Sequence, residues 1–379
     1  MLRDCDPARG LAPSGTSLRT VTKPLLVATS HAIEEFALAS ARDAPLAVVA
    51  MFQRPSYFER EADLYARIAR VAEVTVIGLV GDVPPRLPPG VSHVLLGEDD
   101  PLAREWSVTV LSPRSGATLV ARDLEQVDGA ARSLERGRLF SGRWSFRRGD
   151  AYTELMRLRT TMGSRMTAGQ NGALDEVLGR VVAIPGTETD TRHDAATTVL
   201  LTLLSEERRR ADHIADQLDD VSPGAERDPR SGLATRAFLD RWTDRSATGT
   251  LPLGLVLLRV HELAGVRHRF GFRAELAILQ SVARILRQRT GPADRAVRVG
   301  REEFLLVLPS RDVERLAEEA ARMQATVSAL SGTYPFVPTP ATAVITRTRT
   351  RPLPLGELWA ALDRATEAGI PVTVLRARQ

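Results

Sequence analysis

The chain has 379 residues, a hydrophobic fraction of 43% and a formal net charge of +4 at pH 7. This length is too great for one ordinary core, so it predicts two domains joined by a connector. No apolar run reaches the roughly 18 residues of a transmembrane helix, and the alternation of basic with acidic residues argues against nucleic-acid binding.

The first residues have no apolar signal segment, and we expect residues 1–21 to form a disordered tail. The only cysteine, Cys5, lies in this tail. A single cysteine can form neither an internal disulfide nor a multi-cysteine zinc site, so a cytoplasmic, reducing location is expected.

Short apolar runs alternate with helical patterns in the first predicted domain, residues 22–165. Because several runs are apolar without interruption, we expect an α/β sheet covered on both faces. The predicted strands are Leu25–Ala28, Leu46–Phe52, Val74–Val80 and Val91–Leu96, followed by a hairpin of Trp106–Leu111 and Ala117–Ala121.

A basic and aromatic stretch, Arg138–Arg148, closes the strand region and leads into a predicted helix. Trp144 and Phe146 alternate as core residues of a strand would, so Arg147 and Arg148 are expected to be solvated. The alternative is that this stretch binds an anionic ligand or nucleic acid.

Residues 166–191 are weakly patterned and predict a flexible linker, and residues 192–224 predict a connector helix. Apolar positions in the helix recur at alternating spacings of four and three, interrupted by Glu207. This spacing predicts a two-stranded coiled coil and therefore a homodimer, although one amphipathic helix packed on its own domain is the alternative. The apolar positions are Leu200, Leu204, Ala211, Ile214, Leu218 and Val221.

Strand and helix patterns also alternate in the second predicted domain, residues 225–379, which indicates a second α/β fold. The predicted strands are Leu253–Val260, Ala296–Val299, Phe304–Leu308, Ala341–Ile345 and Val372–Leu375, and the later helices are Asp312–Leu330 and Leu355–Ala368.

Three segments of this domain resemble the GGDEF family. Asp228–Leu239 resembles the opening motif DxLTGLxNRxxF, Arg298–Phe304 resembles the hairpin RxGG(D/E)EF, and Ala361–Gly369 resembles the closing helix ADxALYxAKxxG. The resemblance implies a palm-type α/β domain. Active members of the family are diguanylate cyclases, which join two GTP molecules, one on each protomer of a dimer, into cyclic di-GMP. They use two Mg²⁺ ions held by carboxylates.

The family's functional positions are mostly changed here. The degenerate signature reads Gly300, Arg301, Glu302, Glu303 and Phe304, so its acids are retained and its second glycine is replaced by arginine. Where the family has a metal-binding aspartate at a strand end, this chain has Arg259. His261 replaces a second aspartate, and Arg267 and Leu276 replace the guanine-reading asparagine and the aspartate that assists it. In the closing helix, Thr366 replaces the triphosphate-binding lysine, and Ile370 replaces the basic residue that follows the glycine. At the product site, Gly291 replaces the arginine, and Asp294 is retained.

Replacing a metal-binding carboxylate by a guanidinium changes the local charge by two units where a dication must bind. We therefore expect no catalytic residues, no metal and no cofactor in this domain, and hypothesise that Arg259 pairs with the retained Glu302. A substitute metal site of His261, Glu262 and His268 is disfavoured because arginines crowd it. The alternatives are an active or partner-activating cyclase that uses Mg²⁺ and GTP, or a GTP sensor without turnover.

The first domain resembles the DICT sensory domain in the segments Ser30–Glu35, Leu46–Phe52, Phe58–Glu61 and Arg138–Arg148. This resemblance implies a bacterial signal-sensing regulator of unidentified ligand and protein partner. His31, Glu34 and Glu35 suggest a metal cluster, but capping and surface roles are expected for them instead.

Overall fold

The computed structural model describes residues 18–131, 133–185, 226–243, 251–334 and 339–376, together with positions 197, 207 and 210. The chain forms two compact units. The first comprises Met1–Leu124 and Phe140–Ala211, and the second comprises Glu125–Leu139 and Asp212–Gln379. The six apolar positions predicted for the coiled coil lie outside the described residues.

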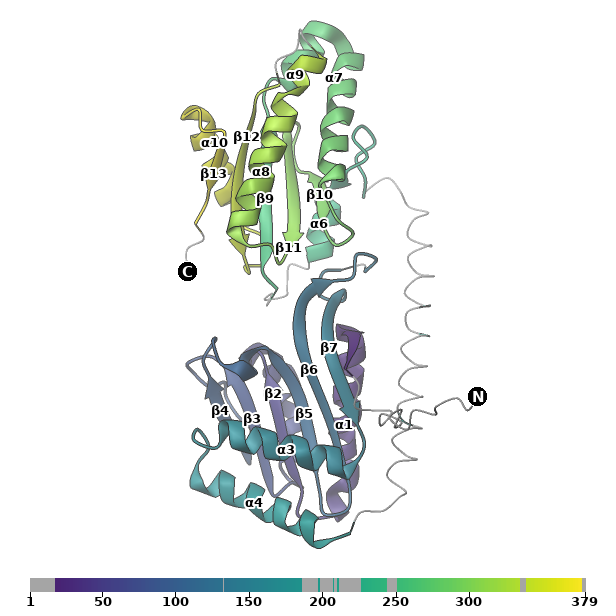
Figure 1. Cartoon of the computed structure of the whole chain (residues 1–379), viewed down its shortest axis with the longest axis vertical. Helices are drawn as coiled ribbons and strands as arrows, with labels where there is room; N and C mark the ends of the chain where they lie inside the picture. Colours follow the sequence, from purple (N-terminus) through teal and green to yellow (C-terminus); the bar gives the residue numbers. More distant parts are fainter. Residues whose placement is uncertain are drawn as a thin grey trace, which may run out of the picture. The chain divides into compact units, whose positions relative to one another are not determined.

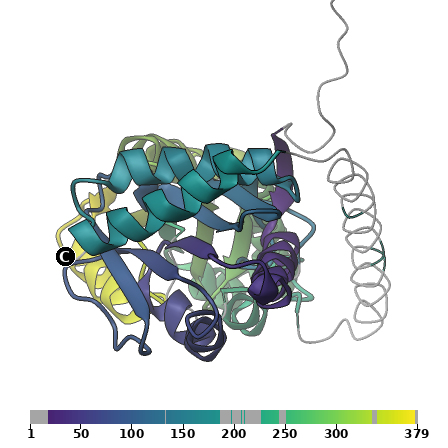
Figure 2. The same cartoon turned by 90° about the horizontal axis from the view of Figure 1, so that it is seen from below.

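The first unit is a mixed sheet with helices on both faces, which confirms the predicted α/β class (Figures 1 and 2). Along β2, alternate residues belong to two apolar clusters, Val48 and Ala50 to one and Ala47 and Val49 to the other. The strands in spatial order are β1 (Arg19–Thr22), β7 (Arg138–Ser145), β6 (Gly116–Val127), β5 (Glu105–Leu111), β2 (Ala47–Phe52), β3 (Val74–Val80) and β4 (Val91–Leu96).

Helices α1 (Lys23–Ala39) and α2 (Pro55–Ile68) cover one face of this sheet. The strand predicted at Leu25–Ala28 is wrong, because these residues form the first turns of α1. Pro24 stands at the start of this helix, where its fixed φ favours helical backbone and its missing N–H costs nothing.

Helices α3 (Arg148–Met162) and α4 (Ala168–Ala183) lie side by side over the other face (Figure 1). Helix α4 occupies most of the segment predicted to be a flexible linker, so that prediction is wrong there. The N-terminus of α4 is closed by a capping box: Thr167 Oγ1 accepts from Gln170 N at 3.2 Å, and Gln170 Oε1 accepts from Thr167 N at 2.7 Å.

Arg148 is buried at 9% exposure, contrary to the expectation that it is solvated, whereas Trp144 is buried as predicted. The guanidinium of Arg148 donates to Pro113 O at 2.6 Å and to Ile184 O at 2.9 Å. Since Ile184 caps the C-terminal end of α4, where free carbonyls carry partial negative charge, the buried cation is stabilised there.

The second unit is a six-stranded sheet with α7 (Leu263–Gln288) and α8 (Val313–Ser328) on one face and α6 (Arg236–Thr243) and α10 (Leu355–Glu367) on the other. The short helix α9 (Leu330–Thr333) follows α8. The strands in spatial order are β13 (Val372–Val374), β12 (Ala341–Thr348), β9 (Leu253–Val260), β11 (Glu303–Pro309), β10 (Arg295–Arg298) and β8 (Ala234–Thr235).

The central strand β9 is antiparallel to both β11 and β12, and successive residues alternate between the two faces. Leu255 and Leu257 join the cluster with α6 and α10, whereas Val256 and Leu258 join the cluster with α7 and α8. Within the described residues, no helix is long and apolar enough to cross a membrane.

Candidate functional site

The opening motif and the hairpin motif of the second unit meet at Asp228. Arg298 donates to Asp228 Oδ2 at 2.9 Å, and also to the carbonyls of Gly300 at 3.2 Å and Arg301 at 3.0 Å across the β10–β11 turn. Burial alone raises the pKa of Asp228, but hydrogen bonds from Ser231 and Arg298 outweigh it and lower that pKa overall. The carboxylate therefore stays charged and holds the turn against the opening segment.

Arg259, near the end of β9, contacts two carboxylates. Its Nε donates to Glu303 Oε1 at 3.0 Å, and its Nη1 donates to Asp363 Oδ1, on α10, at 2.7 Å. Partial burial lowers the pKa of Arg259, but the bonds to Asp363 and Glu303 outweigh it and raise that pKa. A permanent cation is thus fixed between two carboxylates near the end of β9.

The predicted partner of Arg259 was Glu302, and this prediction is wrong. In the antiparallel register Glu303 lies directly opposite Arg259. Because side chains alternate along a strand, neighbouring residues point to opposite faces. Glu302 Oε1 instead accepts a hydrogen bond from the backbone N of Ala264, at the start of α7, at 2.8 Å.

A second charged cluster lies around α7. Glu275 is fully buried, and Arg230 Nη2 lies 2.6 Å from its Oε2 while Arg267 Nε lies 3.9 Å from the same oxygen. Apart from these ion-pair contacts, neither oxygen of Glu275 has a hydrogen-bond partner within the described part of the chain. The guanidinium carbons of Arg230 and Arg267 lie 5.4 and 5.7 Å from the ring centroid of Phe272, within cation–π range.

Among the described residues, the other positions singled out in the sequence form no comparable cluster. His261 Nε2 lies 2.9 Å from Thr342 Oγ1, and burial together with Arg259 lowers the pKa of His261, so its ring is neutral near pH 7. Thr366 bonds back to the carbonyl of Leu362 in its own helix, and Arg301 is exposed. The disfavoured metal site of His261, Glu262 and His268 is not among the convergent metal-ligand groups of the described residues.

Sequence reasoning missed three residues of these clusters: Arg230, Glu275 and Asp363. Arg230 was detectable, because it stands in the opening motif where the family pattern has leucine. The indication in the sequence that Glu275 is part of a cluster was weaker, since an acid on a helix is usually exposed to solvent. Glu275 is buried because of how α7 packs in the folded domain.

Comparison with known families assigns both units. The family model "Sensory domain in DIguanylate Cyclases and Two-component system", DICT, matches residues 8–124, and the model "Diguanylate cyclase, GGDEF domain" matches residues 225–346. The chain carries a DICT domain followed by a GGDEF domain. The second domain is thus homologous to those of diguanylate cyclases, and the sequence-based recognition of both families is confirmed.

Solved structures include similar GGDEF domains. The coiled coil and GGDEF domain of DgcB from Caulobacter crescentus, in complex with c-di-GMP, is 17% identical over 46% of this chain and 99% of that chain, with a TM-score of 0.36. SiaD from Pseudomonas aeruginosa, in complex with its activator SiaC, is 18% identical over 61% of this chain and 88% of that chain, with a TM-score of 0.36. No curated protein matches the chain.

Proposed function

We propose that this protein is a signal-sensing regulator whose GGDEF domain does not synthesise cyclic di-GMP and acts as an output or receptor module under the control of the DICT domain. The observation that carries the proposal is the position of Arg259. Its guanidinium is bonded to Glu303 and Asp363 at 3.0 and 2.7 Å, in the place of a metal-binding carboxylate.

Electrostatics supports this proposal. Two unit charges 4 Å apart interact by about 4 kcal/mol at the effective dielectric constant of a protein surface. A fixed guanidinium therefore repels an incoming Mg²⁺ about as strongly as the missing aspartate would attract it. Moreover, Glu302 and Glu303 already accept hydrogen bonds from Ala264 and Arg259, which an ion would have to displace.

The cluster around Glu275 supports the loss of guanine recognition. Arg267 replaces the guanine-reading asparagine, and with Arg230 it is directed to a buried carboxylate within the protein. A site that lacks the hydrogen-bond partners of its substrate loses discrimination of several kcal/mol.

The test is incubation of the homogeneous full chain with GTP and Mg²⁺, followed by mass detection of cyclic di-GMP, with an active GGDEF protein as positive control. We expect no product. Product from the wild-type chain that disappears in Glu303→Gln would contradict the proposal and establish the chain as a cyclase. Product that persists unchanged in the double variant Glu302→Gln/Glu303→Gln, which removes both signature acids, would come from a contaminant.

Nucleotide binding without turnover is tested separately by thermal unfolding with GTP or cyclic di-GMP, with and without Mg²⁺. A ligand of the folded state at 100 times its Kd adds about 2.7 kcal/mol of stability, which is readily measured. We expect no Mg²⁺-dependent shift with GTP. Such a shift would replace the proposal by a GTP sensor, whereas no shift with either nucleotide favours a protein partner.

We also propose that residues 192–224 form a connector helix through which two copies dimerise, because of their apolar repeat. Light scattering should give a dimer for the wild type and a monomer for the double variant Leu204→Glu/Leu218→Glu, which places charges in the repeat. Arg209→Glu is the control, since the same repeat puts this position opposite the apolar seam. A dimer that survives the double variant would refute this mode of association.

A further inference from the structure

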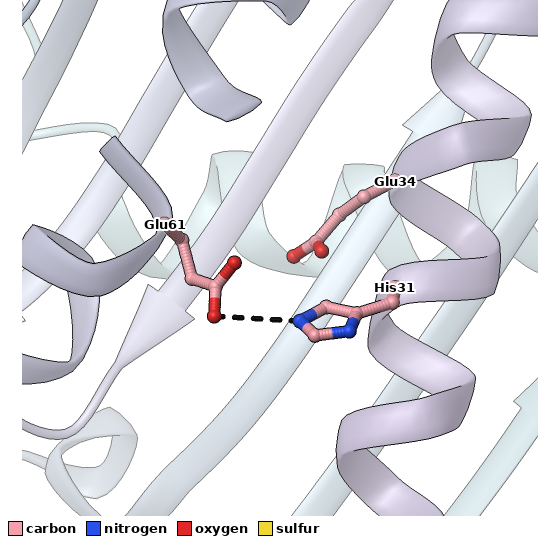
Figure 3. Close-up of side chains that lie close together, drawn as sticks. All are labelled: His31, Glu34 and Glu61. Atoms are coloured by element: carbon pink, nitrogen blue, oxygen red, sulfur yellow. Dashed lines mark hydrogen bonds and ion pairs between the residues drawn. The ribbon is translucent and has the colours of Figure 1, made fainter. Parts of the chain in front are cut away.

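Three potential metal ligands converge in the DICT domain, between α1 and α2 (Figure 3). His31 and Glu34 lie one helical turn apart on α1, and Glu61 is on α2. One donor atom from each side chain lies within 4.8 Å of the other two. His31 Nε2 and Glu61 Oε1 are 3.3 Å apart.

Glu34 gives independent evidence that the cluster is built to receive a ligand. Its side chain is buried, with 1% exposure, and Oε1 accepts hydrogen bonds from Ser30 Oγ and Tyr65 OH, both at 3.1 Å. Its second oxygen, Oε2, is buried and has no hydrogen-bond partner in the described part of the chain. Leaving a buried acceptor unsatisfied costs about 1–3 kcal/mol, more when the group is charged.

We propose that His31, Glu34 and Glu61 bind a divalent first-row transition metal ion, with Zn²⁺ as the probe that best fits the donors. One imidazole and two carboxylates are common ligands of such ions, and the two negative charges neutralise a dication. With metal–ligand bonds of about 2.0–2.1 Å, two ligands of a tetrahedral ion lie about 3.3–3.4 Å apart. The His31–Glu61 separation of 3.3 Å already has this value.

The surroundings of the cluster favour a metal over a simple ion pair. An ion pair between His31 and Glu61 would satisfy those two side chains but would leave Glu34 Oε2 without a partner. Ser30 and Tyr65 hold the Glu34 carboxylate in place, as outer hydrogen bonds commonly orient metal ligands.

Access and coordination also fit a sensory role. The side chains of His31 and Glu61 are 48% and 29% exposed, so an ion can enter from solvent. Three protein ligands leave a fourth position for water or a small ligand. Either the ion itself or a molecule bound to it could then be the input of the DICT domain. This inference does not depend on whether the GGDEF domain turns over GTP.

The experiment is calorimetric titration of Zn²⁺ into the full chain after removal of bound metal, in a Cys5→Ser background that excludes the only thiol. We expect one Zn²⁺ bound per chain at this site, and a Kd at least about tenfold weaker in Glu61→Gln and in His31→Gln. Glu35→Gln is the matched control. It lies on the same helix, is exposed and removes the same charge as Glu61→Gln, so its affinity should equal that of the wild type.

Two results would overturn the proposal: no Zn²⁺ binding to the parent chain, or equal affinity in the parent chain, Glu61→Gln and His31→Gln. Circular dichroism of each variant verifies folding. Because His31 and Glu61 lie on different helices and are both partly exposed, one variant remains informative if the other fails to fold. Parallel titration with Mg²⁺ should show much weaker binding, since imidazole is a poor ligand for that ion.

Discussion

The buried Glu275 of the GGDEF domain should make stability depend strongly on Arg230. In the variant Arg230→Met the apolar stem is retained and the charge is lost, so Arg267, 3.9 Å away, is the one basic partner that Glu275 keeps among the described residues. Breaking a buried ion pair costs about 3–5 kcal/mol. Because Arg230 is 28% exposed and Arg267 still provides some compensation, we expect a loss of about 2–3 kcal/mol.

Urea unfolding of the full chain, followed by circular dichroism and tryptophan fluorescence, measures this loss. With a slope of about 2 kcal/mol per molar urea, the midpoint of the affected transition should fall by about 1–1.5 M. Arg322→Met is the control, because its partner Glu318 is exposed and such surface pairs contribute about 1 kcal/mol or less.

The double variant Arg230→Met/Glu275→Leu separates loss of the pair from loss of packing. Apart from the ion-pair contact of 2.6 Å between Arg230 Nη2 and Glu275 Oε2, neither oxygen of Glu275 has a hydrogen-bond partner within the described residues, so the ion pair alone must offset the desolvation of both charges. The double variant should therefore recover wild-type stability or exceed it. The reasoning is refuted if Arg230→Met loses less than about 0.5 kcal/mol, or if the double variant is less stable than Arg230→Met.

Three further predictions follow from single contacts. Asp228 has a lowered pKa in the folded state, so its bond to Arg298 stabilises the fold above the unfolded-state pKa. This stabilisation is lost as pH falls through the folded-state pKa. Asp228→Asn should therefore be less stable than the wild type at pH 7, and the two curves of stability against pH should converge in acid. In Gly254→Val the new Cβ would lie 2.5 Å from Leu316 Cδ2, and this overpacking should cost about 1–3 kcal/mol in thermal unfolding. Thr167→Ala removes the cap of α4 and should cost about 0.5–2 kcal/mol, with faster amide hydrogen exchange in that helix.

Apolar periodicity predicted most strands of both sheets, and the failures have local causes. Strands Val74–Val80 and Leu253–Val260 were predicted with the bounds observed, since each is a continuous apolar run with polar or turn residues around it. The run Leu25–Ala28 is equally apolar, but periodicity cannot separate a short strand from a buried helix turn. The proline before it was the deciding signal.

The family resemblance led to a predicted contact between Arg259 and the hairpin motif, but it did not give the correct acid. Arg259 was expected to pair with Glu302, whereas it bonds to Glu303. The choice between Glu302 and Glu303 depends on strand register, and a shift of one residue exchanges the two faces of a strand. Glu61 was missed for a related reason: its approach to His31 depends on how two helices pack, which no local pattern encodes.

The carboxylates near the end of β9 and those between α1 and α2 differ in how their oxygens are satisfied, and this difference bears on where a cation can bind. In the GGDEF domain the acids nearest the end of β9 are satisfied from within the chain, Glu303 and Asp363 by Arg259 and Glu302 by the backbone of Ala264. An incoming ion would gain little there, because it must first break those bonds and approach a fixed guanidinium. In the DICT domain, Glu34 keeps a buried oxygen for which the described residues supply no donor, so binding of an ion removes a desolvation cost instead of adding one. Among the described residues, charge compensation therefore favours the cluster of His31, Glu34 and Glu61 over the acids near the end of β9 as a cation site.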